Sequence, residues 1–555
     1  MSENLGYLAG RKGIDQTLFE KLGQAAEVSG SPDQEALETL RKEYLFGKAN
    51  VLGAVSFYDF LKEENKDKKV YVCNGSACLT AGTQNDLHKK LATHFKEDQI
   101  GEMCCLGRCH ENNAFHYQGK NYSGVAFQDF EKILNRQALI TDSYTVSAIG
   151  KQFLTGKPFN TKEITSLLAN CLKKSPEALL DELKSSGLRG RGGAGFPAAF
   201  KLSACRQATS TTGTKFIVCN ADEGDPGAYS DRYLMEHQPE LILIGMILAG
   251  YLAGANKGVI YIRAEYPESI DIMQQHVQRF YENNLAGAAI SGSDFLFDFK
   301  LIKAQGAYIC GEETALLSSI EGQRPEVRVR PPYPAQSGLF NEPTVVNNVE
   351  TLACLPVIFK EGPGIFAASG TNRSAGTKLV SLDGFFNQPG IVEVEMGTPL
   401  RKVIEESGKG FRVPVKALHI GGPLGGIVPV SKMDDLTIDF ESFASNGFLL
   451  GHASIVCIPD NFPMINYLAH LFKFTAHESC GKCFPCRLGS TRGAEMLEKS
   501  MKGNYQIDRK LMDDLLETLE SGSLCMLGGG LPLPIKNALL YFSEELKPYF
   551  KPSAK

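Results

Sequence analysis

The spacing of four cysteines near the C-terminus constrains the fold of this chain more than any other feature. Cys480, Cys483 and Cys486 follow one another at C-x2-C-x2-C intervals, and Cys525 comes after a predicted helix. Short loops of this kind can bring four thiolates to one 4Fe–4S cluster. Zinc also accepts four cysteines, but a C-x2-C-x2-C run is less typical of zinc sites. The sequence therefore predicts a single 4Fe–4S cluster with a helical region around it.

A second group of cysteines lies nearer the N-terminus. Four residues separate Cys73 from Cys78, and three residues separate Cys105 from Cys109. This spacing fits four thiolates around one 2Fe–2S cluster, although Cys104 competes with Cys105 as a ligand. The alternatives are zinc, which usually takes closer C-x2-C pairs, and a redox dithiol, which requires C-x-x-C near a helix start.

The composition narrows the class of protein. A chain of 555 residues, 43% hydrophobic and 22% charged, suggests a globular protein of three or more domains. The formal charge of −5, with no basic block, argues against nucleic-acid binding. Fifteen cysteines, with no secretory signal in Met1–Gln16, predict a reducing, cytoplasmic location. The longest uncharged run, Leu241–Asn256, is shorter than the about 20 residues of a membrane helix, so we expect a buried helix there and no transmembrane segment.

The stretch from Gly187 to Asp231 organises the rest of the chain. It begins with the glycine-rich residues 187–197 and continues through a strand-like run at 215–219 to a polar cluster at 220–227. Glycines let backbone N–H groups approach a phosphate or a flat ring. The G-x-G-x-x-G match in this loop follows a predicted helix at 177–186 instead of a strand, so the ordinary dinucleotide-binding fold is rejected here. A tight surface loop is the simpler interpretation of such a glycine cluster.

Further strands and helices follow in alternation. Strands are predicted at 257–263 and 301–304, with a helix at 266–283 between them. This order implies a parallel sheet with helices on its faces. Ligands bind such sheets beyond the carboxyl ends of the strands, so the loops 220–227 and 308–314 should converge there. The paired amides within 343–351 can read the polar edge of a flavin or its ribityl hydroxyls.

Taken together, these motifs resemble the NADH-binding, FMN-containing subunit of respiratory complex I. They also resemble the diaphorase subunits of soluble NAD-linked hydrogenases and formate dehydrogenases. The likeness covers nearly the whole chain, residues 47–550, and its Cys-Leu-Gly-Arg-Cys form favours Cys105 over Cys104. The Asp-Glu-Gly-Asp-Pro-Gly-Ala sequence at 222–228 looks closest to the subunits of electron-bifurcating hydrogenases.

The resemblance implies four cofactors: FMN, NAD(H), one 2Fe–2S cluster and one 4Fe–4S cluster. In it, Phe196 and Tyr333 would be aromatic contacts to the nucleotide. An isolated acidic residue is usually a helix N-cap or a surface charge, but four of them in two loops after strands favour a binding site. The implied cofactor-binding residues are Gly190, Gly192, Gly193, Gly195, Phe196, Lys201, Asn220, Asp222, Glu223, Tyr308, Gly311, Glu312, Glu313, Tyr333, Asn347, Asn348 and Thr351.

Two positions depart from the family pattern. Asp225 stands near the expected nicotinamide position, where the family commonly has glutamate. Ala204 stands three residues after Lys201, where an aromatic residue is usual. Asp225 is expected to tune the flavin potential or the nucleotide affinity, and Ala204 removes a stacking partner.

The expected fold is a multidomain α/β protein. It comprises a thioredoxin-like ferredoxin domain, a Rossmann-like α/β flavin domain, a β-grasp insert and a C-terminal helical bundle with an iron–sulfur cluster. The expected division is 1–136 (helical lead-in and 2Fe–2S domain), 137–180 (polar connector), 181–365 (FMN and NADH), 366–455 (β-grasp, SLBB-like) and 456–555 (helical 4Fe–4S domain).

The function implied is that of an NADH:acceptor oxidoreductase subunit in a larger soluble complex. Electron bifurcation is a further form of this function that the resemblance suggests. A flavin can accept a hydride and release single electrons to clusters, so no acid–base or nucleophilic catalytic residue is expected. The expected partners are other redox subunits in a hetero-oligomer. The alternative is a non-catalytic electron-transfer scaffold with a degenerate nucleotide site, as Asp225 and Ala204 could indicate.

Overall fold

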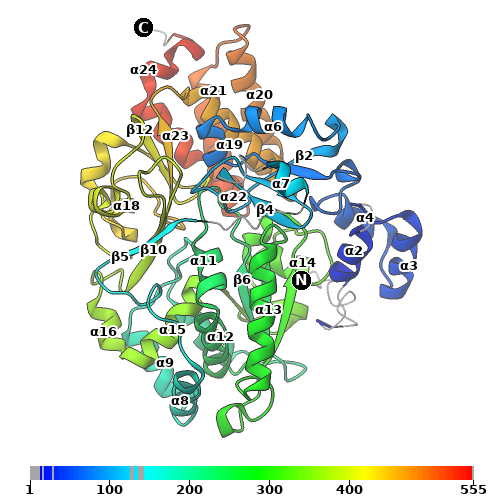
Figure 1. Ribbon diagram of the computed structural model, residues 1–555, viewed down its shortest axis with the longest axis vertical. Helices are drawn as coiled ribbons and strands as arrows, with labels where there is room; N and C mark the ends of the chain where they lie inside the picture. Colours follow the sequence, from blue (N-terminus) through cyan, green and yellow to red (C-terminus); the bar gives the residue numbers. More distant parts are fainter. Residues whose placement is uncertain (1–12, 15–17, 28–29, 125–129, 136–142, 553–555) are drawn as a thin grey trace.

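The computed structural model describes residues 13–14, 18–27, 30–124, 130–135 and 143–552, so most of Met1–Gln16 lies outside the described residues. Figure 1 shows three sheets and a C-terminal group of helices. The N-terminal helices lie on the right of the view, and the C-terminal helices at the top. The N-terminal helices are α2 (Leu18–Ala26), α3 (Gln34–Tyr44) and α4 (Lys48–Val55).

The first sheet is small and mixed, with strand order β2-β1-β3-β4. Strands β1 and β2 are parallel, whereas β3 and β4 form an antiparallel hairpin. Gly82 adopts a left-handed conformation (φ +67°) that ends the helix Ser76–Ala81. The elements are β1 (Val70–Cys73), α5 (Ser76–Ala81), α6 (Gln84–Leu91), β2 (Ile100–Met103), β3 (Phe115–Tyr117), β4 (Lys120–Tyr122) and α7 (Phe130–Leu134).

The central sheet is parallel throughout, with strand order β8-β7-β6-β9, as the alternation of strands and helices predicts. Its strands are β6 (Phe216–Ala221), β7 (Lys257–Ile262), β8 (Asp298–Lys303) and β9 (Thr344–Asn348). The helices of this region are α8 (Thr161–Leu172), α9 (Pro176–Ser185), α10 (Ala198–Gln207), α11 (Ser230–His237), α12 (Pro239–Ala253), α13 (Pro267–Glu282), α14 (Glu313–Ile320), α15 (Val349–Glu361) and α16 (Pro363–Ala368).

Both faces of the central sheet are covered. Successive residues of a strand point to opposite faces. Ile217 and Cys219 therefore pack with α12 and α15, whereas Phe216 and Val218 pack with α14 and the N-terminal helix α2. Burial on both sides explains why β6 is a continuous apolar run instead of an alternating one.

Helix α12 occupies the long uncharged stretch and is buried almost all round, as the sequence predicts. It packs tightly on α15, because a Cβ atom on Gly245 would overlap the carbonyl group of Leu352. Among the described helices, none combines the length and the apolar character needed to cross a bilayer.

The third sheet has six strands in the order β13-β12-β14-β10-β11-β5. Two of them lie outside the range expected for this module. Strand β5 falls within the expected connector and pairs in parallel with β11, and β14 runs past residue 455 to lie between β12 and β10. The elements are β5 (Thr145–Ile149), β10 (Thr377–Leu382), β11 (Gly390–Glu395), α17 (Leu400–Lys402), β12 (Val415–Ile420), β13 (Gly426–Pro429), α18 (Phe440–Ser445) and β14 (Ser454–Pro459).

The C-terminal region is helical, as expected, and has its own apolar core, which includes Leu468, Phe472, Leu497 and Leu516. A π-helical turn (Pro485–Gly489) leads directly from the cysteine-rich loop into α20. The helices are α19 (Met464–Glu478), α20 (Ser490–Met501), α21 (Arg509–Gly522), α22 (Met526–Gly530), α23 (Pro532–Tyr541) and α24 (Ser543–Leu546).

Candidate functional site

The polar loops singled out by the sequence meet beyond the carboxyl ends of the central strands. Asn220, at the end of β6, donates from Nδ2 to the carbonyl oxygen of Gly311 at 2.8 Å. Tyr308 donates its hydroxyl hydrogen to Asp225 Oδ1 at 2.7 Å. Since β6 and β9 are neighbours, Asn347 and Asn348 at the end of β9 lie beside the end of β6.

The glycine-rich loop lies against the start of α15. The backbone N–H of Arg191 donates to Thr351 Oγ1 at 2.8 Å. A Cβ atom on Gly192 would lie 2.9 Å from Cβ of Asn348, closer than real side chains approach, so only glycine allows this contact. Gly190 closes the loop by donating its N–H to the carbonyl oxygen of Phe196 at 2.8 Å. Gly193 and Gly195 have φ values of +119° and +59°, which disfavour larger residues. The four segments 187–196, 220–227, 308–314 and 347–351 thus converge, and we call them the cradle.

The cradle contains buried polar atoms that the protein does not satisfy. Among the described residues, Asp222 Oδ2 and Asn347 Nδ2 have no hydrogen-bond partner. Burial raises the pKa of Asp222 well above its ordinary value, although Arg263 opposes the shift. Unpaired buried polar groups are costly unless a ligand or water pairs with them. A flavin, with ring carbonyls and ribityl hydroxyls, supplies both donors and acceptors, so these residues fit FMN.

Charged side chains form a chain of ion pairs along the cradle. Lys201 Nζ lies 3.0 Å from Glu313 Oε2 and donates to the carbonyl oxygen of Val346 at 3.1 Å. Arg330 pairs with Glu313 at 2.9 Å and with Glu312 at 3.0 Å. Glu312 also caps α14 by accepting from Thr314 N and Ala315 N. Arg330 was not among the residues predicted from the sequence; the signal that could have found it is its place three residues before Tyr333.

The two aromatic residues expected to contact the nucleotide are both open to solvent. Phe196 is 45% exposed and Tyr333 is 56% exposed, an unusual state for rings of this size. Phe196 packs edge to face on Phe200, with ring centroids 5.6 Å apart. Phe196 therefore presents an open aromatic surface beside the glycine-rich loop.

Glu223 has a different environment from the one expected of a cofactor ligand. It is buried, and its carboxylate accepts hydrogen bonds from Asp231 N at 2.9 Å and from Arg232 N at 3.0 Å, at the start of α11. Burial, followed by the charge of Asp231, raises the pKa of Glu223 to about 7. The bonds of Glu223 thus go to the protein itself, and its direct role is to hold α11.

The cysteines expected to bind the 2Fe–2S cluster lie together at the carboxyl ends of β1 and β2. The Sγ atoms of Cys105 and Cys109 are 3.4 Å apart, and the thiol of Cys73 interacts with those of Cys78 and Cys105. All four are buried, whereas Cys104 is only partly buried. This geometry supports Cys105 as the ligand.

The cysteines expected to bind the 4Fe–4S cluster are also gathered in one place. Cys480 and Cys483 lie close enough to Cys486 for their charges to raise the pKa of its thiol. Cys480 and Cys486 act in the same way on the thiol of Cys525. Burial raises the pKa of Cys486 to about 11, so a bound cluster must drive its deprotonation. Four thiolates so placed suit one cubane cluster.

Each cysteine group touches the cradle. Gly227 N donates to Cys109 Sγ at 3.2 Å, at the end of the loop that begins with Asn220. On the other side, Tyr308 N donates to Glu478 Oε2 at 2.9 Å, two residues before Cys480. The C-terminal cysteines also share an apolar core with Ile309 and Cys310. The cradle therefore lies next to both cysteine groups.

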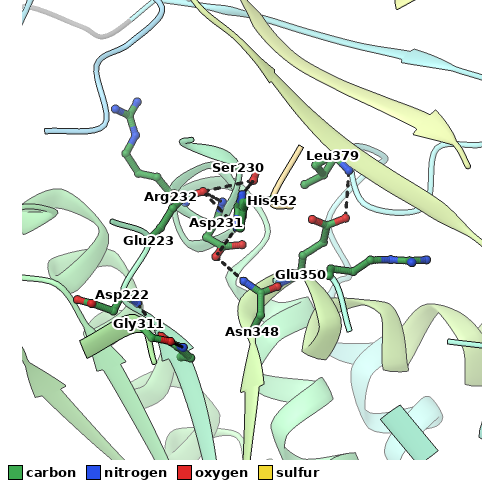
Figure 2. A network of polar contacts seen from close by, with 12 residues as sticks. Asp222, Glu223, Ser230, Asp231, Arg232, Gly311, Asn348, Glu350, Leu379 and His452 are labelled. Atoms are coloured by element: carbon green, nitrogen blue, oxygen red, sulfur yellow. Dashed lines mark hydrogen bonds and ion pairs between the residues drawn. The ribbon is translucent and has the colours of Figure 1, made fainter. Parts of the chain in front are cut away.

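Figure 2 shows a buried polar network beside the cradle that the sequence does not predict. His452 Nε2 lies 3.2 Å from Asp231 Oδ2, and Asn348 Nδ2 donates to the same oxygen at 2.6 Å. Asp231 and His452 are 221 positions apart. No local spacing in the sequence could pair them.

Three family models match the chain in the regions just described. They are the Nuo51 FMN-binding domain over residues 183–357, the NADH-ubiquinone oxidoreductase-F iron-sulfur binding region over 466–549, and the thioredoxin-like [2Fe-2S] ferredoxin over 8–138. These matches confirm the expected FMN, one 4Fe–4S cluster and one 2Fe–2S cluster.

Individual relatives agree with the family models. The chain is 35% identical over 78% of its length to the mitochondrial NADH dehydrogenase [ubiquinone] flavoprotein 1 of Dictyostelium discoideum, covering 88% of that protein. It is 41% identical over 68% of its length to NADP-reducing hydrogenase subunit HndC of Solidesulfovibrio fructosivorans, covering 77% of it. A chain of the solved NAD+-reducing [NiFe]-hydrogenase in the air-oxidized state superposes with a TM-score of 0.86 at 27% identity, covering 100% of this chain and 96% of that one.

Proposed function

This chain belongs to the family of NADH dehydrogenase flavoproteins and the NAD(P)-linked hydrogenase subunits related to them, and from that premise we propose that it transfers electrons between NAD(H) and iron–sulfur clusters through FMN. The observation that carries the proposal is the cradle, in which four distant segments converge next to both cysteine groups. Bound FMN supplies a hydride acceptor that releases electrons one at a time.

Each part of the cradle has a proposed task. The glycine-rich loop, in which Gly192 and Ala194 are exposed, approaches the flavin and its phosphate. Lys201 supplies a positive charge, held by Glu313 and by the carbonyl group of Val346. Asp222 and Asn347 supply the unpaired polar atoms that bind the flavin. Phe196 and Tyr333, whose rings are exposed, stack on the nucleotide.

Cluster ligation is proposed residue by residue. The 2Fe–2S ligands are Cys73, Cys78, Cys105 and Cys109, and the 4Fe–4S ligands are Cys480, Cys483, Cys486 and Cys525. The C-terminal cysteines lie next to the η6 turn (Tyr308–Gly311) of the cradle, where Tyr308 N donates to Glu478 Oε2, two residues before Cys480. Electrons therefore have a short route from the flavin into the C-terminal region.

Asp225 is proposed to tune the site. It is partly buried and held by a hydrogen bond from the hydroxyl group of Tyr308, and desolvation raises its pKa. A carboxyl group held by a hydrogen bond in this position is expected of an intact binding loop. It therefore favours the catalytic function over an electron-transfer scaffold with a degenerate site.

A protein of this kind needs a partner that accepts or supplies electrons. Apolar side chains surround the C-terminal cysteines and stand open to solvent: Phe484 is 75% exposed, Met526 60% and Leu488 59%. Exposed apolar groups gathered in one region mark interaction sites. We propose that another redox subunit docks there in a cytoplasmic hetero-oligomer, consistent with the absence of disulfides among the fifteen cysteines.

The test is anaerobic purification followed by reconstitution with FMN, iron and sulfide. The expected result is stoichiometric FMN, two cluster signals and NADH-dependent reduction of an artificial dye. Lys201→Met should weaken FMN binding, whereas Lys257→Met, which removes a comparable surface ion pair with Asp298, should not. A reconstituted protein that holds both clusters but neither binds FMN nor oxidises NADH would rule the proposal out.

A further inference from the structure

Asp231 is the centre of the buried network beside the cradle. Its Oδ2 atom accepts from Asn348 Nδ2 at 2.6 Å and lies 3.2 Å from His452 Nε2. All of Asp231, His452 and the nearby Glu223 are buried, with His452 Nε2 3.8 Å from Glu223 Oε1. One carboxylate oxygen therefore links the imidazole of His452 to the amide of Asn348 (Figure 2).

The orientation of the Asn348 amide is fixed from both ends. Its Oδ1 atom accepts from Glu350 N at 2.9 Å and from Thr351 N at 3.3 Å, which caps α15. Its Nδ2 atom is held by Asp231. The Cγ and Nδ2 atoms of Asn348 lie 3.3 and 3.6 Å from the place where a Cβ atom on Gly192 would stand, so rotation of the Asn348 side chain would change the surface on which the glycine-rich loop rests.

His452 also lies close to the other side of that loop. Its backbone N is 4.0 Å from the place where a Cβ atom on Gly193 would stand, and Gly451 is closer still. The glycine-rich loop is thus packed between the start of α15 and the turn that carries His452. The backbone at Gly451 and His452 packs against the loop, and the side chain of His452 is linked to the loop through Asp231 and Asn348.

The charges around His452 favour an imidazolium. The groups that face it are Asp231 and Glu223, with Lys378 on β10 and Asp225 farther away. Burial opposes the charged form, but the Asp231 carboxylate outweighs it and raises the pKa of His452 to about 9. The remaining oxygen of the carboxylate, Asp231 Oδ1, is buried with no hydrogen-bond partner among the described residues. Within the part of the chain that the structure describes, Asn348 and His452 alone hold that carboxylate.

We propose that His452 is a positioning residue of the FMN site: it clamps the Asp231 carboxylate, which in turn orients Asn348 beneath Gly192. This inference rests on the proposed function, because it requires that FMN bind in the cradle. It assigns a role in flavin binding to a residue from the six-stranded sheet region, 221 positions beyond Asp231.

The test measures the dissociation constant of FMN by flavin fluorescence, using the full chain with its clusters loaded and its FMN removed. His452→Phe should weaken FMN binding about tenfold or more, because it leaves a buried carboxylate without its charged partner. His452→Gln keeps a hydrogen-bond donor in place and should stay within about threefold of wild type. The matched control is His276→Gln, which removes a histidine 3.0 Å from Glu240, away from the cradle.

A pH series separates positioning from a general effect on folding. Wild type should lose FMN affinity as the pH rises through about 9, because the imidazolium is then neutralised. His452→Gln has no group to titrate there and should show no such loss, and this comparison remains available if His452→Phe does not fold.

The outcomes are distinguishable. Wild-type protein that binds no FMN overturns both the proposed function and this inference. Wild-type protein that binds FMN, together with a folded His452→Phe variant of equal affinity, overturns this inference alone. So does a loss of affinity above pH 9 that is the same in wild type and in His452→Gln.

Discussion

Burial changes the chemistry of single residues around the cradle. Burial raises the pKa of Glu223 to about 7, whereas the Asp231 carboxylate, against the effect of burial, raises that of His452 to about 9. Both groups therefore hold protons more tightly in the folded chain than in the unfolded one. Since a group that binds protons in the native state favours folding at lower pH, both shifts act in the same direction.

This gives a prediction for stability against pH. The contribution of His452 is fully present below its ordinary pKa of 6.5 and is lost as the pH rises through about 9. Wild type should be more stable than His452→Gln at pH 6 by on the order of 3 kcal/mol, and the difference should vanish by about pH 10. Thermal melts of cluster-loaded protein between these limits measure it. A difference that grows with pH would contradict the assignment of His452 as an imidazolium.

At the scale of elements, the contact between α12 and α15 fixes the start of α15, where Asn348 and Thr351 lie. Gly245 allows this contact because its missing Cβ atom would occupy the space of the Leu352 carbonyl group. The neighbouring atoms belong to the backbone of α15, which cannot move aside for a Cβ atom as a flexible side chain would. The position of Asn348 and Thr351 therefore depends on a glycine in a helix outside the four segments of the cradle.

Gly245→Ala should destabilise the chain by about 1–3 kcal/mol, the usual cost of overpacking a core, and should also weaken FMN binding. Gly53→Ala is the matched control: it lies in the helix α4, where a Cβ atom would meet nothing within 4 Å. There alanine should be neutral or stabilising by up to about 1 kcal/mol. Denaturant unfolding of both variants, with FMN titration, compares them; equal stabilities would show that α12 and α15 are not tightly packed.

The elements also show what the sequence could and could not predict. Helix α12 and the strands β6 and β7 were predictable, because their apolar runs are local and largely buried. Strand β5 was not, since it is a short, half-exposed edge strand that exists only through pairing with β11, which lies much later in the chain. The expected boundary at 455 cut through β14 because the chain crosses back into that sheet just before the C-terminal helices.

The candidate site divides in the same way. Glycines, paired amides and cysteines carry their signal in short spacings, so the loops of the cradle and both cysteine groups could be found from the sequence. The link between Asp231 and His452 could not, because it joins two loops far apart in the sequence. The hydrogen bonds from Glu223 to the start of α11 could not be predicted either, because a carboxylate that caps a helix and one that faces a cofactor look the same in a polar cluster.

At the scale of the whole molecule, the cradle lies next to both cysteine groups, and the apolar surface around Phe484 surrounds the C-terminal one. This arrangement places the proposed exit for electrons where a partner would dock. In Figure 1 the N-terminal helices lie on the right of the view and the six-stranded sheet on the left.

Phe484→Ser should weaken assembly with the partner protein by about tenfold or more if Phe484 anchors the interface, without loss of bound FMN or cluster content. Leu45→Ser is the matched control, since Leu45 is 67% exposed at the end of α3, far along the chain from the C-terminal region. Co-purification with the partner proteins, with iron and flavin content checked, gives the comparison. Equal loss of assembly in both variants would contradict docking at the C-terminal cysteines.

The most direct test of the account is rapid-freeze electron paramagnetic resonance after mixing the protein anaerobically with NADH, with and without bound FMN. The FMN-loaded protein should show a reduced 4Fe–4S signal, which Cys480→Ser removes and which substitution of the buried Cys354 by serine leaves in place. FMN-depleted protein with intact clusters should show no reduction on the same timescale. Equal cluster reduction without FMN, or none in the FMN-loaded protein, would contradict the claim that the cradle passes electrons from NADH to the clusters.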